Sequence, residues 1–313
     1  MTSKRMFTFA PLLAAVLLAL PATGRGAEDA TAAAAGELAR KGLITDTHID
    51  VPYRLHENWA DVTRATEDGD FDYERARAGG LDIPFMSIYT PAESEAEGSS
   101  YAIANRLIDS VEALVGRAPD RFVIVRNPDE AEQAFRSGKV GLAMGMENGS
   151  PIDGDLANLV HFYERGIRYI TLAHSLSNHL SDSSYDDERR WHGLSDFGKQ
   201  VIAEMNRVGM MVDLSHLSDE AAWDALNVSK APVIASHSSA RHFTPEFERN
   251  ISDELIKAVA DGGGVIQINF GSSFVTEEAR AWSDVYWKLQ GEHKKANGLA
   301  DGSPALEQFS KDY

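Results

Sequence analysis

Short apolar runs alternate with amphipathic stretches along most of this chain. Strand-like runs occur at residues 43–47, 83–89, 140–146, 168–173, 208–212, 232–235 and 265–270, with one more short run at 122–125. Helical patterns lie at residues 99–115, 128–137, 156–165, 195–207, 218–226, 252–260 and 277–296. The polar pattern of residues 54–80 predicts a loop with a short helix, and that of residues 297–313 predicts a loop. Strand–helix alternation of this kind implies a parallel sheet.

Polar residues follow five of the strand-like runs at the point where each run ends. In a parallel barrel, the carboxyl ends of the strands open into one shared mouth, where catalysis is found. We therefore predict an α/β fold, a (β/α)8 TIM-type barrel, in preference to an open doubly wound sheet. Seven core strands can be counted, whereas a closed barrel has eight. The glycines at 262–264 precede a strand, so they do not form a phosphate-binding loop.

The strand ends carry residues that can bind a metal ion. His48 and Asp50 are two positions apart, so an extended strand directs both side chains to one side. Two successive strand–helix units each place a histidine after the strand: His216 follows the run at 208–212, and His237 follows the run at 232–235. Any one of these side chains, taken alone, is more often a hydrogen-bonded histidine or a solvated acid than a ligand. Their repeated position favours a metal site, and the strand ends together supply His48, Asp50, Glu147, His174, His216 and His237.

Nitrogen and oxygen ligands of this kind suit a divalent metal, and zinc is the metal predicted. The set is larger than one catalytic zinc ion needs, so two ions bridged by Glu147 are predicted. The first ion would be held by His48, Asp50 and Glu147, and the second by Glu147, His216 and His237. Such pairs lie about 3.5–4 Å apart and hold a bridging hydroxide. His174 would then be free to bind substrate or to stabilise an oxyanion. The remaining histidines are interpreted as ordinary surface residues.

The N-terminus has the features of a secretory signal peptide. Lys4 and Arg5 precede an apolar run at 7–20, and small residues follow it. The run has about 14 residues, whereas a membrane anchor needs about 20. We predict a signal peptide at 1–27 with cleavage between Ala22 and Ala27, a linker at 28–42 and one catalytic domain at 43–313. The mature protein would be exported, periplasmic or secreted, without a stable membrane anchor.

Charge and composition narrow the choice of partners and ligands. The net charge is −18, and removal of residues 1–27 takes away three basic residues and no acidic residue, which gives −21. Such an excess of acid argues against nucleic acid as a partner. The chain has no cysteine, which excludes thiolate ligands and a cysteine nucleophile. A homodimer is compatible with the sequence.

From His48 onward, the chain resembles the membrane (renal) dipeptidase family of dinuclear zinc peptidases, which have an amidohydrolase-type barrel. The matching segments occur in the family's order over residues 43–270. They are DTHID (46–50), GMENG (145–149), YITLAH (169–174), GLSDFG (193–198), DLSH (213–216), PVIASHSSA (232–240) and RN (249–250).

The resemblance implies zinc-dependent hydrolysis of dipeptides by a metal-bridged hydroxide, with C-terminal D-residues and some β-lactams also accepted. It implies that the zinc ligands are His48, Asp50, Glu147, His216 and His237. It also implies that His174 and Arg249 contact the substrate, with Arg249 pairing with the C-terminal carboxylate. Glu147 and His174 are the predicted catalytic residues.

Two departures from the family pattern leave alternatives open. Asn148 stands where glycine often follows the bridging glutamate. The family also has an aspartate after its eighth strand, the expected proton carrier, and no such motif occurs before Tyr313. We therefore expect a C-terminally incomplete chain with an unclosed barrel. The alternatives are an impaired or vestigial zinc-binding barrel, and another binuclear amidohydrolase acting on a lactone, phosphoester or cyclic amide.

Overall fold

The computed structural model of the protein describes residues 23–300 and 303–313, so the apolar run of the predicted signal peptide lies outside the described residues. The chain divides into two compact units, Met1–Gly42 and Leu43–Tyr313. The described part of the first unit is helix α1 (Thr23–Lys41). The predicted linker is therefore helical, because its alanines have the highest helix propensity. Within the described residues, no helix combines the length and the apolar character that a membrane crossing requires.

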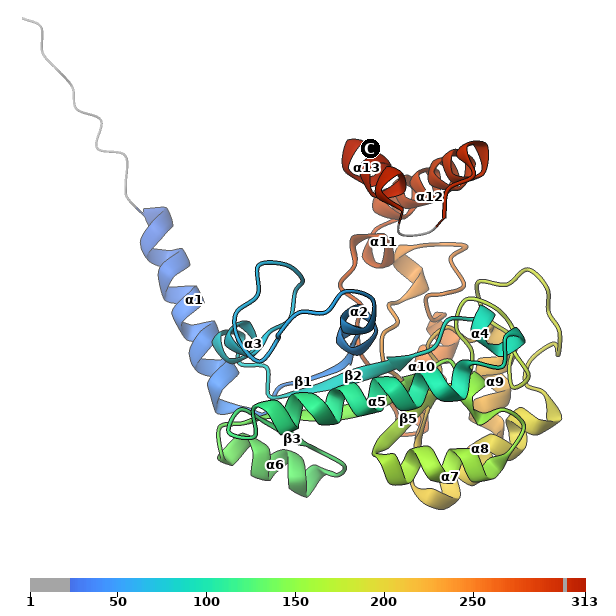
Figure 1. Cartoon of the computed structure of the whole chain (residues 1–313), viewed down its shortest axis with the longest axis horizontal. Helices are drawn as coiled ribbons and strands as arrows, with labels where there is room; N and C mark the ends of the chain where they lie inside the picture. Colours follow the sequence, from blue (N-terminus) through green and yellow to red (C-terminus); the bar gives the residue numbers. More distant parts are fainter. Residues whose placement is uncertain (1–22, 301–302) are drawn as a thin grey trace, which may run out of the picture. The chain divides into compact units, whose positions relative to one another are not determined.

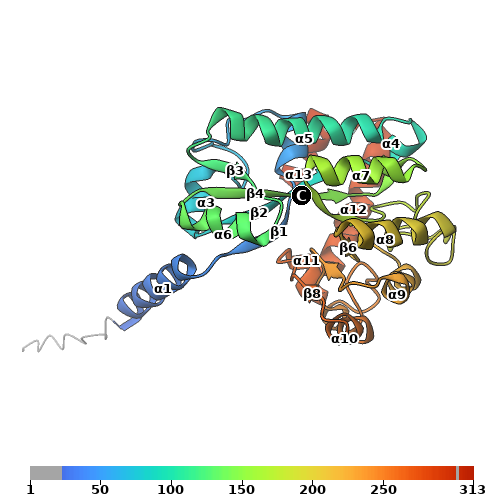
Figure 2. The ribbon, with the colours of Figure 1, turned by 90° about the horizontal axis from the view of Figure 1, so that it is seen from below.

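The larger unit is built on a parallel sheet that curls into a half-barrel (Figure 2). This architecture confirms the predicted barrel-type α/β fold and the count of seven core strands. A further strand, β3 (Phe122–Ile124), pairs only with β4. The seven strands, in spatial order, are β1 (Thr45–Ile49), β2 (Ile83–Tyr89), β4 (Val140–Glu147), β5 (Ile167–Thr171), β6 (Met211–Asp213), β7 (Ile234–Ala235) and β8 (Val265–Ile266).

Helices follow the strands; those over residues 100–117, 128–136 and 156–165 lie on the outer face of the curled sheet, whereas those from residue 272 onward do not (Figure 1). Serines begin three of them: the side chains of Ser195, Ser218 and Ser252 each accept a hydrogen bond from a backbone N–H three residues later. The sequence predicted all three starts. The helices of this unit are α2 (Val51–Glu57), α3 (Tyr73–Gly79), α4 (Glu93–Ala96), α5 (Ser100–Arg117), α6 (Pro128–Arg136), α7 (Leu156–Arg165), α8 (Asp196–Val208), α9 (Asp219–Val228), α10 (Asp253–Asp261), α11 (Ser272–Val275), α12 (Glu277–Asn297) and α13 (Pro304–Asp312).

The prediction of a loop over residues 297–313 was wrong, because α13 occupies most of that stretch. Ser303 and Pro304 form a helix start, since proline is well suited to the first helical turn. Leu306 is buried, and the rings of Phe309 and Tyr313 stack at 5.7 Å. Packing of these apolar side chains explains why a segment without a long periodic pattern is helical.

Strand register aligns the carboxyl ends of the central strands. Glu147, the last residue of β4, pairs with Tyr89 at the end of β2 and with Thr171 at the end of β5. Thr171 in turn pairs with Asp213 at the end of β6. Side chains that follow these positions therefore start at the same level of the half-barrel, and they are able to converge.

Asp72 lies at the start of α3, outside the group of strand ends, and its contribution to the stability of the fold can be tested there. It precedes α3, and its carboxylate accepts hydrogen bonds from the backbone N–H groups of Arg75 and Thr66 and from Arg75 Nε at 2.7 Å. Burial raises the pKa of Asp72, but these hydrogen bonds and the Arg75 charge outweigh burial, so the pKa is lowered. Loss of such a capping carboxylate costs about 1–3 kcal/mol. We expect Asp72→Ala to lower the free energy of unfolding at pH 7 by this amount in chemical denaturation.

The pH dependence of this contribution follows from the sign of the shift. A carboxyl group whose pKa is lower in the folded state adds stability above its unfolded pKa, about 3.9. That contribution disappears as the pH falls through the folded-state pKa. The stability difference between the unmodified protein and Asp72→Ala should therefore be constant above about pH 5 and shrink below pH 4. A difference that grew at acidic pH would contradict this assignment.

Candidate metal centre

Four histidine rings surround one buried carboxylate at the mouth of the half-barrel. Glu147 is only 4% exposed. Its Oε1 atom lies 3.0 Å from Nε2 of His216, 3.2 Å from Nε2 of His237 and 3.6 Å from Nε2 of His174. Its Oε2 atom lies 3.3 Å from Nε2 of His48. The structure thus brings together five of the six strand-end residues selected from the sequence.

Among the described residues, these side chains form two compact groups of ligand atoms that share Glu147. One group adds His48 and His237 to the glutamate, and the other adds His174 and His216. This pairing differs from the predicted one, in which His237 accompanies His216 and His174 is not a ligand. The predicted assignment of the ligands to two ions therefore remains a prediction.

Asp50 lies at the edge of the cluster. Its Oδ1 atom is 3.3 Å from Nε2 of His48, but its side chain is 67% exposed and it belongs to neither compact group. Asp50 is the single residue between β1 and α2. Asp50 therefore contacts His48 at the edge of the cluster but is not part of either compact group of ligand atoms.

Local backbone conformation helps to aim the side chains. Asn148 has φ of 74°, a left-handed conformation that asparagine tolerates better than most residues. This explains how asparagine serves where glycine is often found. His216 also has a positive φ of 68° in the turn after β6. His174 lies three residues beyond the end of β5, so the sequence placed the end of that strand too late.

Burial and neighbouring charges set the protonation of the cluster. Burial raises the pKa of Glu147, but the positive charge of His48 and the close contacts with the rings of His216 and His237 outweigh burial and hold the pKa well below its ordinary value. Burial lowers the pKa of His237 to about 4, and it also lowers the pKa of His216. Glu147 is therefore ionised at neutral pH and these two rings are neutral, the forms that bind metal ions.

The arrangement fits a divalent cation. Nε2 of His216 and Nε2 of His237 lie 3.0 Å apart, a separation that fits either an N–H···N hydrogen bond or two nitrogens bound to one cation. Nδ1 of His174 and Nδ1 of His216 are buried without a hydrogen-bond partner among the described residues. The donor set is nitrogen and oxygen only, as a borderline divalent metal prefers. His48, Asp50, Glu147, His174, His216 and His237 are the residues that could hold it.

A cavity of about 860 Å³ opens onto this cluster. Its walls include three tyrosines that sequence reasoning did not select, namely Tyr53, Tyr89 and Tyr185. The Tyr89 ring packs edge-on against His174, with centroids 4.7 Å apart. Tyr89 ends β2, so its position at a strand end was a usable signal. Tyr185 comes from the long polar loop between β5 and α8, which therefore forms one wall of the cavity.

Arg249 contributes a buried positive charge to the same cavity. Its Nη1 atom donates to Ser238 Oγ at 2.8 Å, and its Nη2 atom donates to the His237 carbonyl at 2.9 Å. Its Nε atom has no partner among the described residues. A guanidinium group has five N–H donors. Arg249 therefore has unused donors and is held at a set distance from the cluster through the backbone of His237.

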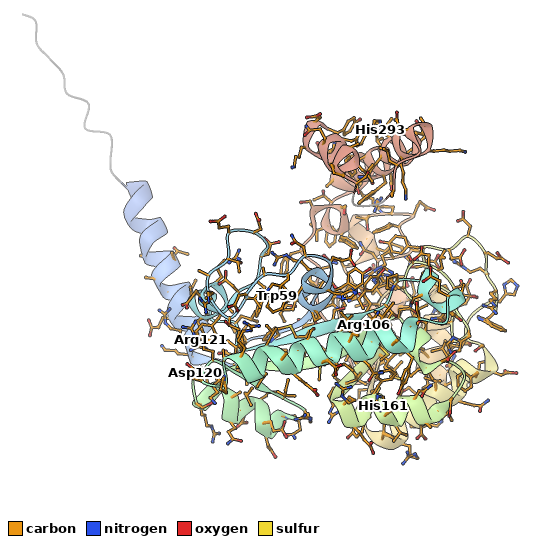
Figure 3. The ribbon with its side chains drawn as sticks, viewed as in Figure 1. Trp59, Arg106, Asp120, Arg121, His161 and His293 are labelled. Atoms are coloured by element: carbon orange, nitrogen blue, oxygen red, sulfur yellow. The ribbon has the colours of Figure 1, made fainter. Side chains whose placement is uncertain are left out.

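The other histidines were interpreted as ordinary surface residues, and this is correct only in part. His56, His192 and His242 are exposed, whereas His161, His179 and His293 are half-buried. Nε2 of His161 on α7 lies 2.8 Å from Oδ1 of Asn105 on α5. The ring of His293 on α12 stacks on that of Phe309, and Figure 3 labels His161 and His293. His179 pairs with Glu95 at 2.9 Å. None of them belongs to a metal-binding group in the described part of the chain.

Comparisons with known proteins give a consistent result. The family model for membrane dipeptidase (peptidase family M19) matches residues 32–296. An uncharacterized dipeptidase of Schizosaccharomyces pombe is 34% identical over 310 residues, which cover 88% of this chain and 74% of that protein. The probable dipeptidase PvdM of Pseudomonas aeruginosa has a similar structure, with a TM-score of 0.71 and 27% identity over 77% of this chain. This chain spans 63% of the length of PvdM.

A second solved structure resembles the fold equally well. It is a metallopeptidase from Rhodobacter sphaeroides, bound to a phosphinate mimic of the dipeptide L-Ala-D-Ala. The TM-score is 0.69 and the identity is 27%, over 76% of each chain.

Proposed function

Because this chain belongs to the membrane dipeptidase family, peptidase family M19, we propose that it hydrolyses dipeptides at the metal centre around Glu147. The observation that carries this proposal is the convergence of four histidine rings on one buried carboxylate, in a cavity that also contains Arg249. Such a cavity joins a candidate site for divalent metal to a fixed positive charge, and both suit the cleavage of a short peptide with a free carboxylate.

The metal is proposed to be zinc, with two ions bridged by Glu147. The ligands would be His48, Asp50 and Glu147 for one ion, and Glu147, His216 and His237 for the other. Divalent ions in such a site supply a nucleophile at neutral pH and polarise the scissile carbonyl. The protein's own contribution is to hold an ionised Glu147 and neutral histidine rings in a largely buried position.

Arg249 is proposed to bind the C-terminal carboxylate of the substrate. The unused donors of its guanidinium group suit the two oxygens of a carboxylate. Because the guanidinium group also bonds the His237 carbonyl, the distance from carboxylate to cleaved bond is set by the protein. This limits the substrate to about one residue beyond that bond. The Rhodobacter sphaeroides relative binds a mimic of L-Ala-D-Ala, which supports acceptance of a C-terminal D-residue.

The test is a direct assay of the purified protein. We expect about two zinc ions per chain by elemental analysis and hydrolysis of L-Ala-L-Ala and L-Ala-D-Ala, with no cleavage of the corresponding tripeptides. Chelation should abolish hydrolysis, and added zinc should restore it. Folded protein that binds zinc but cleaves no dipeptide would overturn the proposed activity, and folded protein that binds no divalent metal would overturn the site itself.

His174 is proposed to contact the reacting carbonyl of the substrate and not to bind metal. Loss of a group that stabilises an oxyanion costs about 10²–10³ in kcat. We therefore expect His174→Ala to lower kcat by this factor while the zinc content stays at that of the unmodified protein. A variant that loses one zinc ion would show instead that His174 and His216 hold metal together, as their shared group with Glu147 allows.

A further inference from the structure

Behind the metal centre, Asp213 accepts hydrogen bonds from two directions. It is fully buried at the end of β6. Its Oδ1 atom accepts from the backbone N–H groups of Ser236 at 2.8 Å and Ser215 at 3.2 Å. Its Oδ2 atom accepts from the hydroxyls of Thr171 and Ser236, the latter at 2.6 Å. Asp213 thus acts as an acceptor in every contact, as an ionised carboxylate must.

This requirement determines the role of the Ser236 hydroxyl toward the neighbouring histidine. Ser236 Oγ lies 2.7 Å from Nδ1 of His237. A hydroxyl has one proton, and that of Ser236 is directed to Asp213. The hydroxyl can therefore only accept from His237, so Nδ1 of that ring carries the hydrogen. The lone pair of the neutral ring is then on Nε2, the atom 3.2 Å from Glu147.

A second pair of hydrogen bonds, which we call a relay like the one through Asp213 and Ser236, fixes the hydrogen on Nδ1 of His48. Nδ1 of His48 lies 2.9 Å from the hydroxyl of Tyr169, and that hydroxyl donates to the carbonyl of Thr47 at 2.9 Å. The tyrosine proton is therefore committed to a carbonyl, which cannot donate in return. Nδ1 of His48 must donate to the tyrosine, which leaves Nε2 as the atom that faces Glu147.

Tyr169 is itself accommodated by a glycine in the glutamate strand. A Cβ atom at Gly145 would lie 2.0 Å from Cζ of the Tyr169 ring. Glycine at this position in the segment GMENG is therefore needed for the ring to cross β4 and reach His48. The same segment thus supplies the shared carboxylate and the space for a residue that orients one of its histidines.

We propose that Asp213 with Ser236, and Tyr169 with the Thr47 carbonyl, are positioning residues that keep a hydrogen on Nδ1 of His237 and His48 and so direct Nε2 of each ring to the metal. This inference rests on the proposed metal-dependent function and adds residues that act through the ligands. Partners of this kind orient the ring and raise its basicity, and their loss typically costs 10–100-fold in metal affinity.

The variants Ser236→Ala and Tyr169→Phe remove one relay each. Phenylalanine keeps the ring that packs beside Gly145, and alanine removes one atom from a small buried side chain. We expect the dissociation constant for zinc, measured by competition with a chromogenic chelator, to rise by about 10–100-fold in each variant.

The matched control is Thr171→Val. It deletes a buried hydroxyl that donates to the same Oδ2 atom of Asp213 but does not touch His237. Valine has nearly the shape of threonine. We expect Thr171→Val to bind zinc almost as tightly as the unmodified protein. An equal loss of affinity in Thr171→Val and Ser236→Ala would overturn the inference, because the effect would then reflect the packing around Asp213.

A spectroscopic measurement tests the position of the ring hydrogen directly. In the metal-free protein, the ¹⁵N chemical shifts of the His237 ring should show a protonated Nδ1 and an unprotonated Nε2, with the signals assigned through His237→Gln. In Ser236→Ala the two shifts should move toward the average of both tautomers. A ring of the unmodified protein that carries its hydrogen on Nε2 would overturn the inference.

These outcomes separate the inference from the proposed function. If the unmodified protein binds no zinc, the proposed metal centre fails and the relays fail with it. If it binds zinc and cleaves dipeptides while Ser236→Ala and Tyr169→Phe bind zinc unchanged, the function stands and the positioning role is wrong.

Discussion

Replacement of Glu147 by alanine should abolish dipeptide hydrolysis and release the bound metal. Glu147 is the one side chain common to both groups of residues that could hold a metal ion, and four histidine nitrogens lie within 3.0–3.6 Å of its carboxylate. Without it, neither group keeps an anionic ligand that is buried. Loss of metal-ion catalysis removes several kcal/mol of transition-state stabilisation, which corresponds to a decrease in kcat/KM of more than about 10³-fold.

Zinc content, kcat/KM and thermal stability should all be measured on this variant. The unmodified protein should gain stability on addition of zinc, because a ligand that binds only the folded state stabilises it by mass action. Glu147→Ala should lose most of that gain. The matched control is Glu95→Gln, which changes a carboxylate paired with His179 outside the cluster. Full zinc content and activity in Glu147→Ala would exclude Glu147 as the shared ligand.

The sequence pointed to this cluster because its residues follow strands that the hydrophobic pattern predicts. Glu147 and His216 could be located at strand ends from that pattern alone, and parallel strands bring such ends together. The same reasoning predicted the seven core strands and the serine starts of three helices. These features depend on local chemistry and on a simple rule of topology, so a single sequence is sufficient to find them.

Other features depend on tertiary contacts that no local pattern records. The grouping of His174 with His216 follows from ring positions beyond the ends of β5 and β6, with centroids 4.3 Å apart. Tyr169 was visible only as an apolar strand residue, yet its hydroxyl crosses to His48 on β1. The helix α13 was missed because its aromatic rings pack against rings of α12, as Phe309 does against His293. Strand register and packing between elements determine the grouping of the histidines, the contact of Tyr169 and the formation of α13.

Replacement of Arg249 by methionine should weaken the hydrolysis of dipeptides that have a free C-terminal carboxylate. Truncation of one partner of a buried charge pair costs about 2–5 kcal/mol. This corresponds to a loss of roughly 30-fold to several thousand-fold in kcat/KM. The loss should appear mainly in KM if the contact is equally strong in the ground state and in the transition state. Arg249→Lys keeps the charge but not the planar fork, so we expect an intermediate effect.

A comparison of L-Ala-L-Ala with its C-terminal amide distinguishes carboxylate recognition from a general disturbance of the buried site. The kcat/KM of the unmodified protein should be higher for the free acid than for the amide, by about the factor that Arg249→Met loses on the free acid. Arg249→Met should lose this preference while its activity on the amide changes little. Arg241, which pairs with both oxygens of Asp219, provides the matched control, and Arg241→Met should keep the preference. If Arg249→Met lost activity equally on both substrates, Arg249 would act on the metal centre through its bond to the His237 carbonyl and would not bind the substrate carboxylate. Because the guanidinium group contacts that carbonyl and lines the cavity, only the paired substrates separate these two roles.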